Sequence, residues 1–346
     1  MIPRTMHAML LTGFGGPEHL RHTEVPVPTL EDDEVLIRVR AAATNRVEID
    51  IRRGLSGLGP PLPLVMGPDG AGEAVAVGVA VKDIVVGDHV LPHTMVSCGR
   101  CENCQRGRDN VCRRIRILGS TMWGCHAEYV VAPAHRVVKL PPELPFEVMA
   151  AGNKFCTAWE ALAVTAGLRA GEVVLINAAA GGVGSCAVQV ARHLGARVIA
   201  AVGSAAKIDQ VRANGADEVI DYGTTDLLER VRSLTDGRGV DVGLDIAGGA
   251  LFHPTLQSVT DGGRLALIGA HAGKMIEIDL TDLFRRHVAV MGCGRWTKAI
   301  SQHVVGLLAA GALKPTIFKT MPLAALNEAH ALMSDRTVNG RIVLLP

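Results

Sequence analysis

An apolar strand, a glycine-rich loop and a helix follow one another between residues 173 and 194. This combination constrains the fold more than any other part of the sequence. Residues 173–176 are entirely apolar, the loop reads Ala-Ala-Gly-Gly-Val-Gly over 179–184, and apolar residues then recur at helical spacing up to residue 194. A second apolar run at 197–202 predicts the next strand. A helix that joins two such strands makes them parallel neighbours in one sheet.

Strands and helices continue to alternate after this unit. We expect a helix near 204–214 and strands at 218–220, 240–246, 264–268 and 287–291. This alternation predicts an α/β fold with a doubly wound parallel sheet of the Rossmann type.

The first 150 residues have a different pattern. Short apolar or alternating runs are separated by Gly and Pro turns, which favours a β-rich, barrel-like domain. A helix at 302–310 and a strand at 341–345 are assigned back to this domain. With 346 residues the chain is long enough for two domains. The expected domains are a β-rich catalytic domain (1–152 and 298–346) and a dinucleotide-binding domain (153–297).

The glycine loop has the chemistry of a dinucleotide site. Ala179 occupies the first position of a GxGxxG variant, Gly181 lets the backbone approach a pyrophosphate, and Gly184 lets the helix pack close to the strand. Gly182 and Val183 begin the helix, whose free N–H groups favour phosphate. The alternative is a tight strand–helix turn that binds nothing.

The end of the second strand indicates which cofactor binds. NAD sites place Asp or Glu there for the ribose hydroxyl, whereas this chain has Gly203 and Ser204, followed by Lys207. Ser204 and Lys207 can donate to a 2′-phosphate, so we expect NADP(H), although Lys207 could instead lie on a solvated helix face. We also expect cofactor contacts from Tyr222 and from Cys293, which stands between two glycines after the last strand.

Four of the eight cysteines lie within fifteen residues. Cys98, Cys101, Cys104 and Cys112 give the spacing C-x2-C-x2-C-x7-C. Four thiolates form the closed tetrahedron of a structural Zn²⁺ site, which leaves no position open for chemistry. An iron–sulfur cluster is the competing interpretation. The other four cysteines are scattered, and we expect them to be free and buried.

Charge and hydropathy exclude several classes of protein. Lys and Arg number 35 against 34 Asp and Glu, so no global field recruits nucleic acid. No charge-free apolar run reaches the roughly 18 residues of a membrane span, and residues 1–11 do not resemble a secretory leader. We therefore expect a cytoplasmic protein that acts on small molecules.

Together these features resemble the medium-chain dehydrogenase/reductase superfamily. The resemblance covers nearly the whole chain and rests on the four-cysteine lobe and the segments 67–72, 86–90, 127–130, 178–184, 194–196 and 215–217. It implies a barrel-like catalytic domain and a Rossmann domain with the active site in the cleft, and dimers or tetramers formed through the Rossmann domains.

Zinc alcohol dehydrogenases of that superfamily carry a second, catalytic zinc. Its ligand positions correspond here to Asn45, Pro68 and Asn153, with Asp69 next to the proline. Asparagine is a poor zinc ligand and proline has no donor atom. We therefore expect the structural zinc without the catalytic one. This pattern is similar to the quinone oxidoreductase and enoyl-reductase branch, which uses NADPH.

The expected reaction is hydride transfer to a quinone or an α,β-unsaturated carbonyl. Candidate catalytic residues are Asn45 as an amide donor, Asp50 as an acid, and Thr157 beside Cys156. Asn45 could instead brace a turn, and Asp50 could pair with a neighbouring arginine. Asp50 also departs from the tyrosine that many quinone oxidoreductases have there. Two alternatives stay open: an alcohol dehydrogenase with a rearranged metal site, and a non-catalytic NADPH-binding protein.

Overall fold

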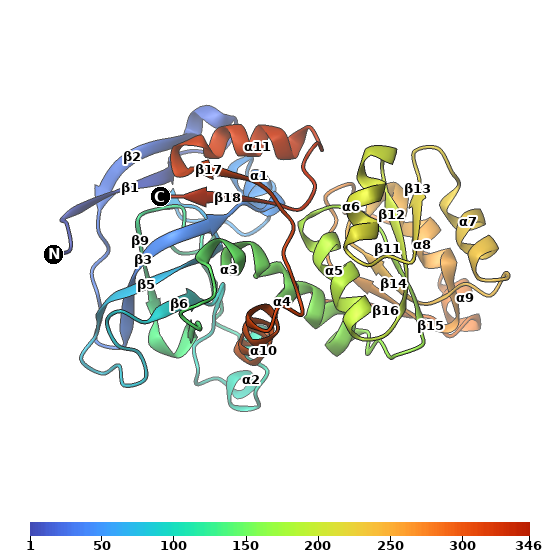
Figure 1. Ribbon diagram of the computed structural model, residues 1–346, viewed down its shortest axis with the longest axis horizontal. Helices are drawn as coiled ribbons and strands as arrows, with labels where there is room; N and C mark the ends of the chain where they lie inside the picture. Colours follow the sequence, from blue (N-terminus) through green and yellow to red (C-terminus); the bar gives the residue numbers. More distant parts are fainter. The chain divides into compact units, whose positions relative to one another are not determined.

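The computed structural model describes all residues from 1 to 346 and consists of two compact units (Figure 1). The first unit contains Met1–Asn153 and Trp296–Pro346, and the second contains Lys154–Arg295. No helix in the chain combines the length and the apolar character that a membrane crossing needs.

The second unit is built on a six-stranded parallel sheet. Its strands have the order β13-β12-β11-β14-β15-β16, with every neighbouring pair parallel. This arrangement confirms the predicted doubly wound sheet, because the strand order reverses direction beside the first strand. The strands are β11 (Val173–Ile176), β12 (Arg197–Val202), β13 (Glu218–Asp221), β14 (Val240–Asp245), β15 (Val259–Leu267) and β16 (Ala289–Gly292).

Helices cover both faces of this sheet. In Figure 1, α5 and α6 lie on one side of the strands, and α7 and α8 lie on the other. The central strand β11 is apolar and buried throughout, because both of its faces meet helices. The helices are α4 (Lys154–Trp159), a π-helical continuation (Glu160–Thr165), α5 (Gly182–His193), α6 (Ile208–Ala213), α7 (Leu227–Leu234), α8 (Phe252–Ser258) and α9 (Leu280–Arg285).

The first unit is rich in sheet, as its sequence pattern predicts. A seven-stranded sheet has the order β10-β6-β5-β3-β18-β17, with β9 also paired to β3. A three-stranded sheet (β2-β1-β4) and a two-stranded sheet (β7-β8) complete it. The bounds are β1 (Thr5–Leu11), β2 (Leu20–Pro26), β3 (Glu34–Ala43), β4 (Leu64–Val65), β5 (Asp69–Val77), β6 (His89–Pro92), β7 (Met95–Val96), β8 (Arg116–Ile117), β9 (Tyr129–Pro133), β10 (Val137–Lys139), β17 (Ile317–Pro322) and β18 (Arg341–Leu345).

The C-terminal strand lies in the middle of the first unit. β18 pairs antiparallel with β3 and parallel with β17. The last residues of the chain therefore lie in the same sheet as β3, which begins at Glu34. Its buried side chains join a core with β1 and α11. The helices of this unit are α1 (Arg46–Arg52), α2 (Glu102–Gln105), α3 (Phe146–Gly152), α10 (Lys298–Ala309) and α11 (Leu326–Ser334).

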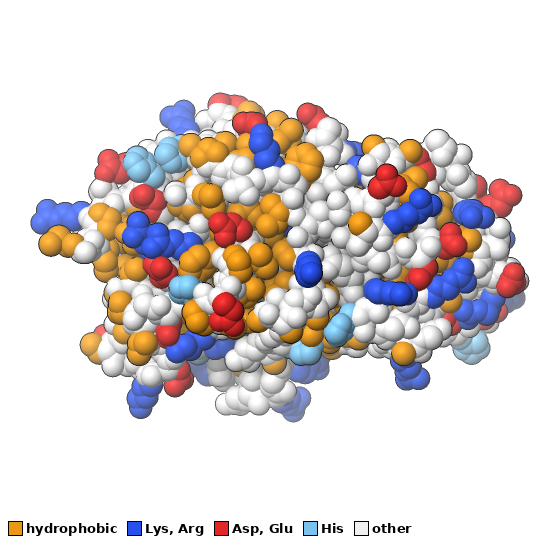
Figure 2. Space-filling model, viewed as in Figure 1, with side chains coloured by type: hydrophobic (Ala, Val, Ile, Leu, Met, Phe, Trp, Pro, Cys, Tyr) orange, Lys and Arg blue, Asp and Glu red, His pale blue; other side chains and the backbone are white.

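Charged side chains of both signs are interspersed on the face of the second unit that Figure 2 shows. This pattern fits the formal net charge of +1 for the whole chain.

Candidate functional site

The glycine loop follows β11 directly and ends in the first turn of α5. Ala178 has a φ of 49°, which places it in the left-handed region that non-glycine residues rarely adopt, immediately before the loop. The Ala179 N–H donates to the Ala201 carbonyl at 3.0 Å, which ties the start of the loop to β12. Gly181 is the N-cap of α5, and Gly182 and Val183 follow it. The first N–H groups of the helix therefore have no partner within it.

Two of the loop glycines are needed for different reasons. A Cβ added to Gly184 would lie 2.4 Å from the Ala178 carbonyl oxygen and 2.6 Å from the Ala179 Cα, so packing of the helix against the loop excludes any side chain. At Gly181 the nearest atom would be 3.4 Å away, which is ordinary contact. The protein itself thus leaves space for a methyl group at Gly181. A ligand that approaches this backbone explains the glycine better than packing does, and the loop fits a dinucleotide pyrophosphate.

The four residues expected beside the cofactor's adenosine ribose lie at the ends of β12 and β13. A Cβ on Gly203 would lie 2.9 Å from the Tyr222 hydroxyl, so the phenol covers this glycine. The Lys207 N–H donates to the Ser204 carbonyl at 3.1 Å in the turn that follows β12. Residues 203–207 contain no carboxylate, whereas β13 ends in Asp221, whose Oδ1 accepts from the Gly223 N–H at 2.9 Å.

Thr157 and Cys293 lie in the same unit. Thr157 is buried on α4, and its Oγ1 has no hydrogen-bond partner. A buried hydroxyl without a partner is uncommon, and a bound ligand is one way to satisfy it. Cys293 follows β16, and its Sγ donates to the Leu267 carbonyl at 3.2 Å. Burial, reinforced by the charge of Glu160, raises the pKa of Cys293 to about 12, so it remains a neutral thiol.

The first unit holds a buried polar network where the resemblance places catalytic zinc ligands. Asp69 Oδ2 accepts hydrogen bonds from Arg341 Nη2 at 2.7 Å and Asn45 Nδ2 at 3.0 Å. Asp69 Oδ1 accepts one from Asn153 Nδ2 at 2.7 Å, and Thr94 Oγ1 lies 3.4 Å from it. All five side chains are buried. The carboxylate is thus neutralised by a guanidinium and surrounded by amide and hydroxyl donors.

This donor set does not fit a catalytic zinc. None of these five side chains is a thiol or an imidazole, and the Asp69 carboxylate is already paired with Arg341 at 2.7 Å. A divalent ion beside Asp69 would face the positive charge of the arginine. The residues that contact Asp69 come from the start of α1, the end of α3, the β6–β7 connection and the start of β18. Arg341 and Thr94 were not among the residues expected from the sequence. The sequence feature that could have indicated Arg341 is its position as the first residue of a strand that is otherwise apolar.

Asn45 and Asp50 have surroundings that limit their roles. The Asn45 Nδ2 is shared among Asp69, Glu48 and the Ala43 carbonyl, and its Oδ1 accepts from Arg341 Nη1 at 3.2 Å. The amide is therefore held within the network, and Asn45 precedes α1 without capping it. Asp50 is partly exposed on α1. Burial lowers the pKa of Arg46, and the negative charge of Asp50 partly offsets this effect.

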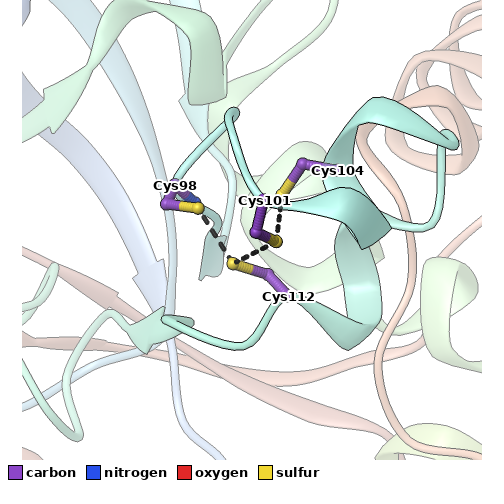
Figure 3. A group of neighbouring side chains, drawn as sticks. All are labelled: Cys98, Cys101, Cys104 and Cys112. Carbon is purple, nitrogen blue, oxygen red and sulfur yellow. Dashed lines mark hydrogen bonds between the residues drawn. The ribbon is translucent and has the colours of Figure 1, made fainter.

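The four clustered cysteines converge on one point (Figure 3). Their sulfur atoms all lie within 4.8 Å of one another. The Cys101 and Cys104 sulfurs are 3.5 Å apart, and those of Cys101 and Cys112 are 3.8 Å apart. Four thiolates at zinc bonding distance are separated by about 3.8 Å, so the arrangement has room for one ion. A cluster of several irons and sulfides would need wider spacing, which disfavours the iron–sulfur alternative.

Backbone amides complete this lobe. The N–H groups of Cys98 and Arg114 each donate to the Cys112 sulfur at 3.3 Å. Hydrogen bonds from the backbone at Cys104, and then at Arg113, lower the pKa of Cys101 to about 6. Such donors stabilise thiolates, the form that binds metal.

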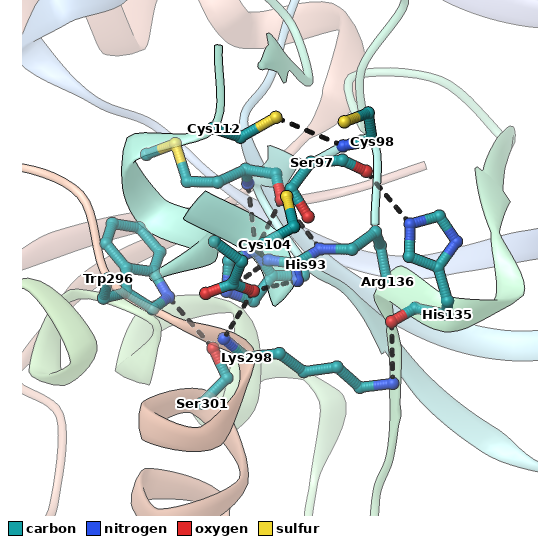
Figure 4. Close-up of polar contacts among 12 residues, drawn as sticks. His93, Ser97, Cys98, Cys104, Cys112, His135, Arg136, Trp296, Lys298 and Ser301 are labelled. Atoms are coloured by element: carbon teal, nitrogen blue, oxygen red, sulfur yellow. Dashed lines mark hydrogen bonds and ion pairs between the residues drawn. The ribbon is translucent and has the colours of Figure 1, made fainter. Parts of the chain in front are cut away.

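Arg136 fastens the lobe to the rest of its unit (Figure 4). Its Nη1 forms an ion pair with Asp109, which lies between the third and fourth cysteines. Its Nε donates to the Met95 carbonyl at 3.0 Å, and its Nη2 lies 2.9 Å from His93 Nδ1. Burial, and then the charge of Arg136, lowers the pKa of His93 to about 3, so the imidazole is neutral and accepts from the guanidinium. The His93 ring also lies 5.8 Å from that of Trp296.

Comparisons with known proteins place the chain in a family. Residues 31–142 match the alcohol dehydrogenase GroES-like domain, and residues 182–310 match the zinc-binding dehydrogenase family. Human quinone oxidoreductase is 31% identical over 99% of this chain and 98% of its own. An alcohol dehydrogenase of Geobacillus stearothermophilus is 32% identical over 98% of this chain and 99% of its own. A solved structure described as an NAD-dependent alcohol dehydrogenase has a TM-score of 0.94 and 38% identity, covering 99% of this chain and all of the other.

Proposed function

We propose that this chain, an oxidoreductase that belongs to the medium-chain dehydrogenase/reductase superfamily, reduces quinones or α,β-unsaturated carbonyl compounds with NADPH and without a catalytic metal. One observation carries the proposal: the Asp69 carboxylate is paired with the Arg341 guanidinium at 2.7 Å, and Asn45 and Asn153 hold its oxygens. Without a Lewis acid, a simple ketone loses several kcal/mol of oxyanion stabilisation. A conjugated acceptor needs less, because its charge spreads over carbon and oxygen.

Each residue has a limited task in this mechanism. When bound, NADPH supplies the hydride. The backbone around Gly181 holds the pyrophosphate, and Ser204 and Lys207 hold the 2′-phosphate. Thr157 offers its unpartnered hydroxyl to the nicotinamide or substrate. Asn45, fixed by Asp69 and Arg341, orients the reducible substrate through its position, because its amide hydrogens are already shared among Asp69, Glu48 and the Ala43 carbonyl.

NADPH oxidation against a panel of quinones, enones and aldehydes tests this function, with NADH as the control. Turnover of quinones or enones supports the proposal. Alcohol oxidation accompanied by two zinc ions per chain would identify an alcohol dehydrogenase instead. Tight NADPH binding without turnover of any compound would identify a non-catalytic binding protein.

The coenzyme preference depends on Lys207. Replacing Lys207 with alanine removes one charge-assisted hydrogen bond, so the Kd for NADPH should rise about 10- to 100-fold while that for NADH stays constant. Fluorescence titration with both coenzymes measures this. Arg212→Ala, an exposed position on α6, is the matched control and should change neither affinity. Because one similar structure is described as NAD-dependent, tighter binding of NADH by the unaltered protein would refute the choice of NADPH.

The cysteine lobe should hold one structural zinc. We expect one zinc per chain by metal analysis, and less than a tenth of that in Cys112→Ser, because loss of one thiolate opens the tetrahedron. Limited proteolysis should then cut the variant between residues 98 and 112. Cys186→Ser, a buried position outside the lobe, should keep the full zinc content. Iron or labile sulfide in the purified protein would contradict this assignment.

A further inference from the structure

Glu48 lies completely buried between two histidines that the proposed reaction does not use. Its Oε2 is 3.2 Å from His330 Nε2 and 3.6 Å from His126 Nδ1, and all three side chains have no solvent exposure. Glu48 lies on α1, His330 on α11, and His126 just before β9. We call these three residues the Glu48 cluster.

Both rings lie next to the Glu48 carboxyl group, and His126 also faces the backbone of Ala43. The two ring nitrogens of His126 and the Nδ1 of His330 are buried without hydrogen-bond partners. The backbone of His126 is fixed, because its N–H donates to the Met66 carbonyl at 2.9 Å and its carbonyl accepts from the Met9 N–H at 2.8 Å. Since a neutral imidazole has one donor and one acceptor nitrogen, the proton in the hydrogen bond between His330 and Glu48 can reside on either side, whereas His126 at 3.6 Å only adjoins the carboxyl group.

Burial favours neutral imidazoles in the cluster. Burial raises the pKa of Glu48, against the opposing effects of His126, the Asn45 hydrogen bond and Arg341, whereas Asp69 raises it further. The Cys125 thiol also faces Glu48, but burial raises the pKa of this thiol and keeps it neutral. Burial lowers the pKa of His126, although Glu48 and Asp69 oppose this and His330 reinforces it. Burial, and then the charge of Arg52, lowers the pKa of His330 to about 3. Glu48 is therefore the group of the three that changes its charge as the pH rises above the usual carboxyl range.

Glu48 also contacts the site of the proposed reaction. The Asn45 Nδ2 lies 3.2 Å from Glu48 Oε1 and 3.0 Å from Asp69 Oδ2, so one amide bridges two carboxyl groups. An ionised carboxylate holds an amide N–H more strongly than a protonated one. The charge of Glu48 thus acts on the orientation of Asn45.

We propose that Glu48 is a positioning residue that shares one proton with His330, next to the uncharged ring of His126, and that release of this proton tightens its hold on Asn45. The inference rests on the proposed function, in which Asn45 orients the substrate. Because ionised Glu48 holds the amide more firmly, kcat should rise with pH as Glu48 ionises, through a midpoint above the ordinary carboxyl pKa.

The kinetic test compares Glu48→Gln with the unaltered enzyme from pH 5 to 9, using NADPH and a substrate that the panel identifies. The glutamine keeps the shape but cannot ionise. We expect the pH-dependent limb to disappear and kcat to fall about fivefold at high pH, with little change in KM. Glu73→Gln, which removes a carboxylate paired with Arg40 at 2.7 Å in the same unit, is the control and should retain the limb. A limb that persists in Glu48→Gln would overturn the proposal.

A second measurement does not depend on turnover, so it separates this inference from the proposed function. NMR of the full-length protein with ¹³C-labelled histidines should show two rings that stay neutral down to pH 5, assigned by their loss in His126→Gln and His330→Gln. Both should shift when Glu48 is replaced with Gln and stay unchanged in Glu73→Gln. Rings that titrate near pH 6.5, or a metal ion lost together with His126, would refute the shared proton.

Discussion

Replacing Arg341 with methionine should lower the free energy of unfolding by about 3–5 kcal/mol, because the change leaves Asp69 as a buried carboxylate without its cation. Methionine keeps much of the volume of the arginine stem, so a cavity contributes little to the loss. Arg341 Nη1 also donates to Asn45, and that hydrogen bond disappears as well. Urea unfolding followed by circular dichroism measures the effect.

Two variants separate the buried charge from other causes. Lys319→Met breaks an ion pair with Glu328 whose side chains are about half exposed, and it should cost less than about 1 kcal/mol. Adding Asp69→Asn to Arg341→Met removes the stranded carboxylate and should restore part of the lost stability. If the double variant were as unstable as the sum of the two single ones, the pairing would not explain the effect.

The parts of the fold that local pattern determines could be predicted from the sequence. Predicted strands at 173–176, 197–202 and 341–345 coincide with β11, β12 and β18, because continuous apolar runs between turns mark buried strands. β2 gave no such signal: only two of its residues, Leu20 and Val25, are buried, so its sequence does not alternate. Helix α10 begins at Lys298 instead of residue 302, because Lys298 and Ser301 interrupt the apolar pattern of its first turn.

The candidate site likewise has a part that could be predicted from the sequence and a part that could not. The cysteine cluster was predictable because all four ligands lie within fifteen residues and their spacing reflects one loop. Asp69 and Arg341 are 272 residues apart, and only the antiparallel pairing of β18 with β3 brings the arginine to the network. His126 and His330 likewise meet Glu48 through tertiary packing, so no local pattern could have paired them.

Gly181→Ala should raise the Kd for NADPH at least 100-fold while leaving the protein folded. The structure has space for the methyl group, whose nearest neighbour would be 3.4 Å away, so we expect stability to change by about 1 kcal/mol or less. A pyrophosphate held by this backbone would lose two charge-assisted hydrogen bonds, which is worth about 3–6 kcal/mol. Isothermal titration with NADPH and thermal unfolding without it measure the two quantities separately.

Gly184→Ala should give the opposite pattern and serves as the matched comparison. Its Cβ would lie 2.4 Å from a backbone oxygen, so the loop or the helix must shift, at a cost of about 1–3 kcal/mol in unfolding free energy. Gly306→Ala, where a Cβ meets nothing within 4 Å on α10, should affect neither property adversely. Packing within the protein leaves room for a methyl group at Gly181, so a loss of NADPH affinity in Gly181→Ala would arise at the binding surface and not from packing. Unchanged NADPH affinity in Gly181→Ala would therefore refute the proposal that the dinucleotide binds at this loop, regardless of the results for Gly184→Ala.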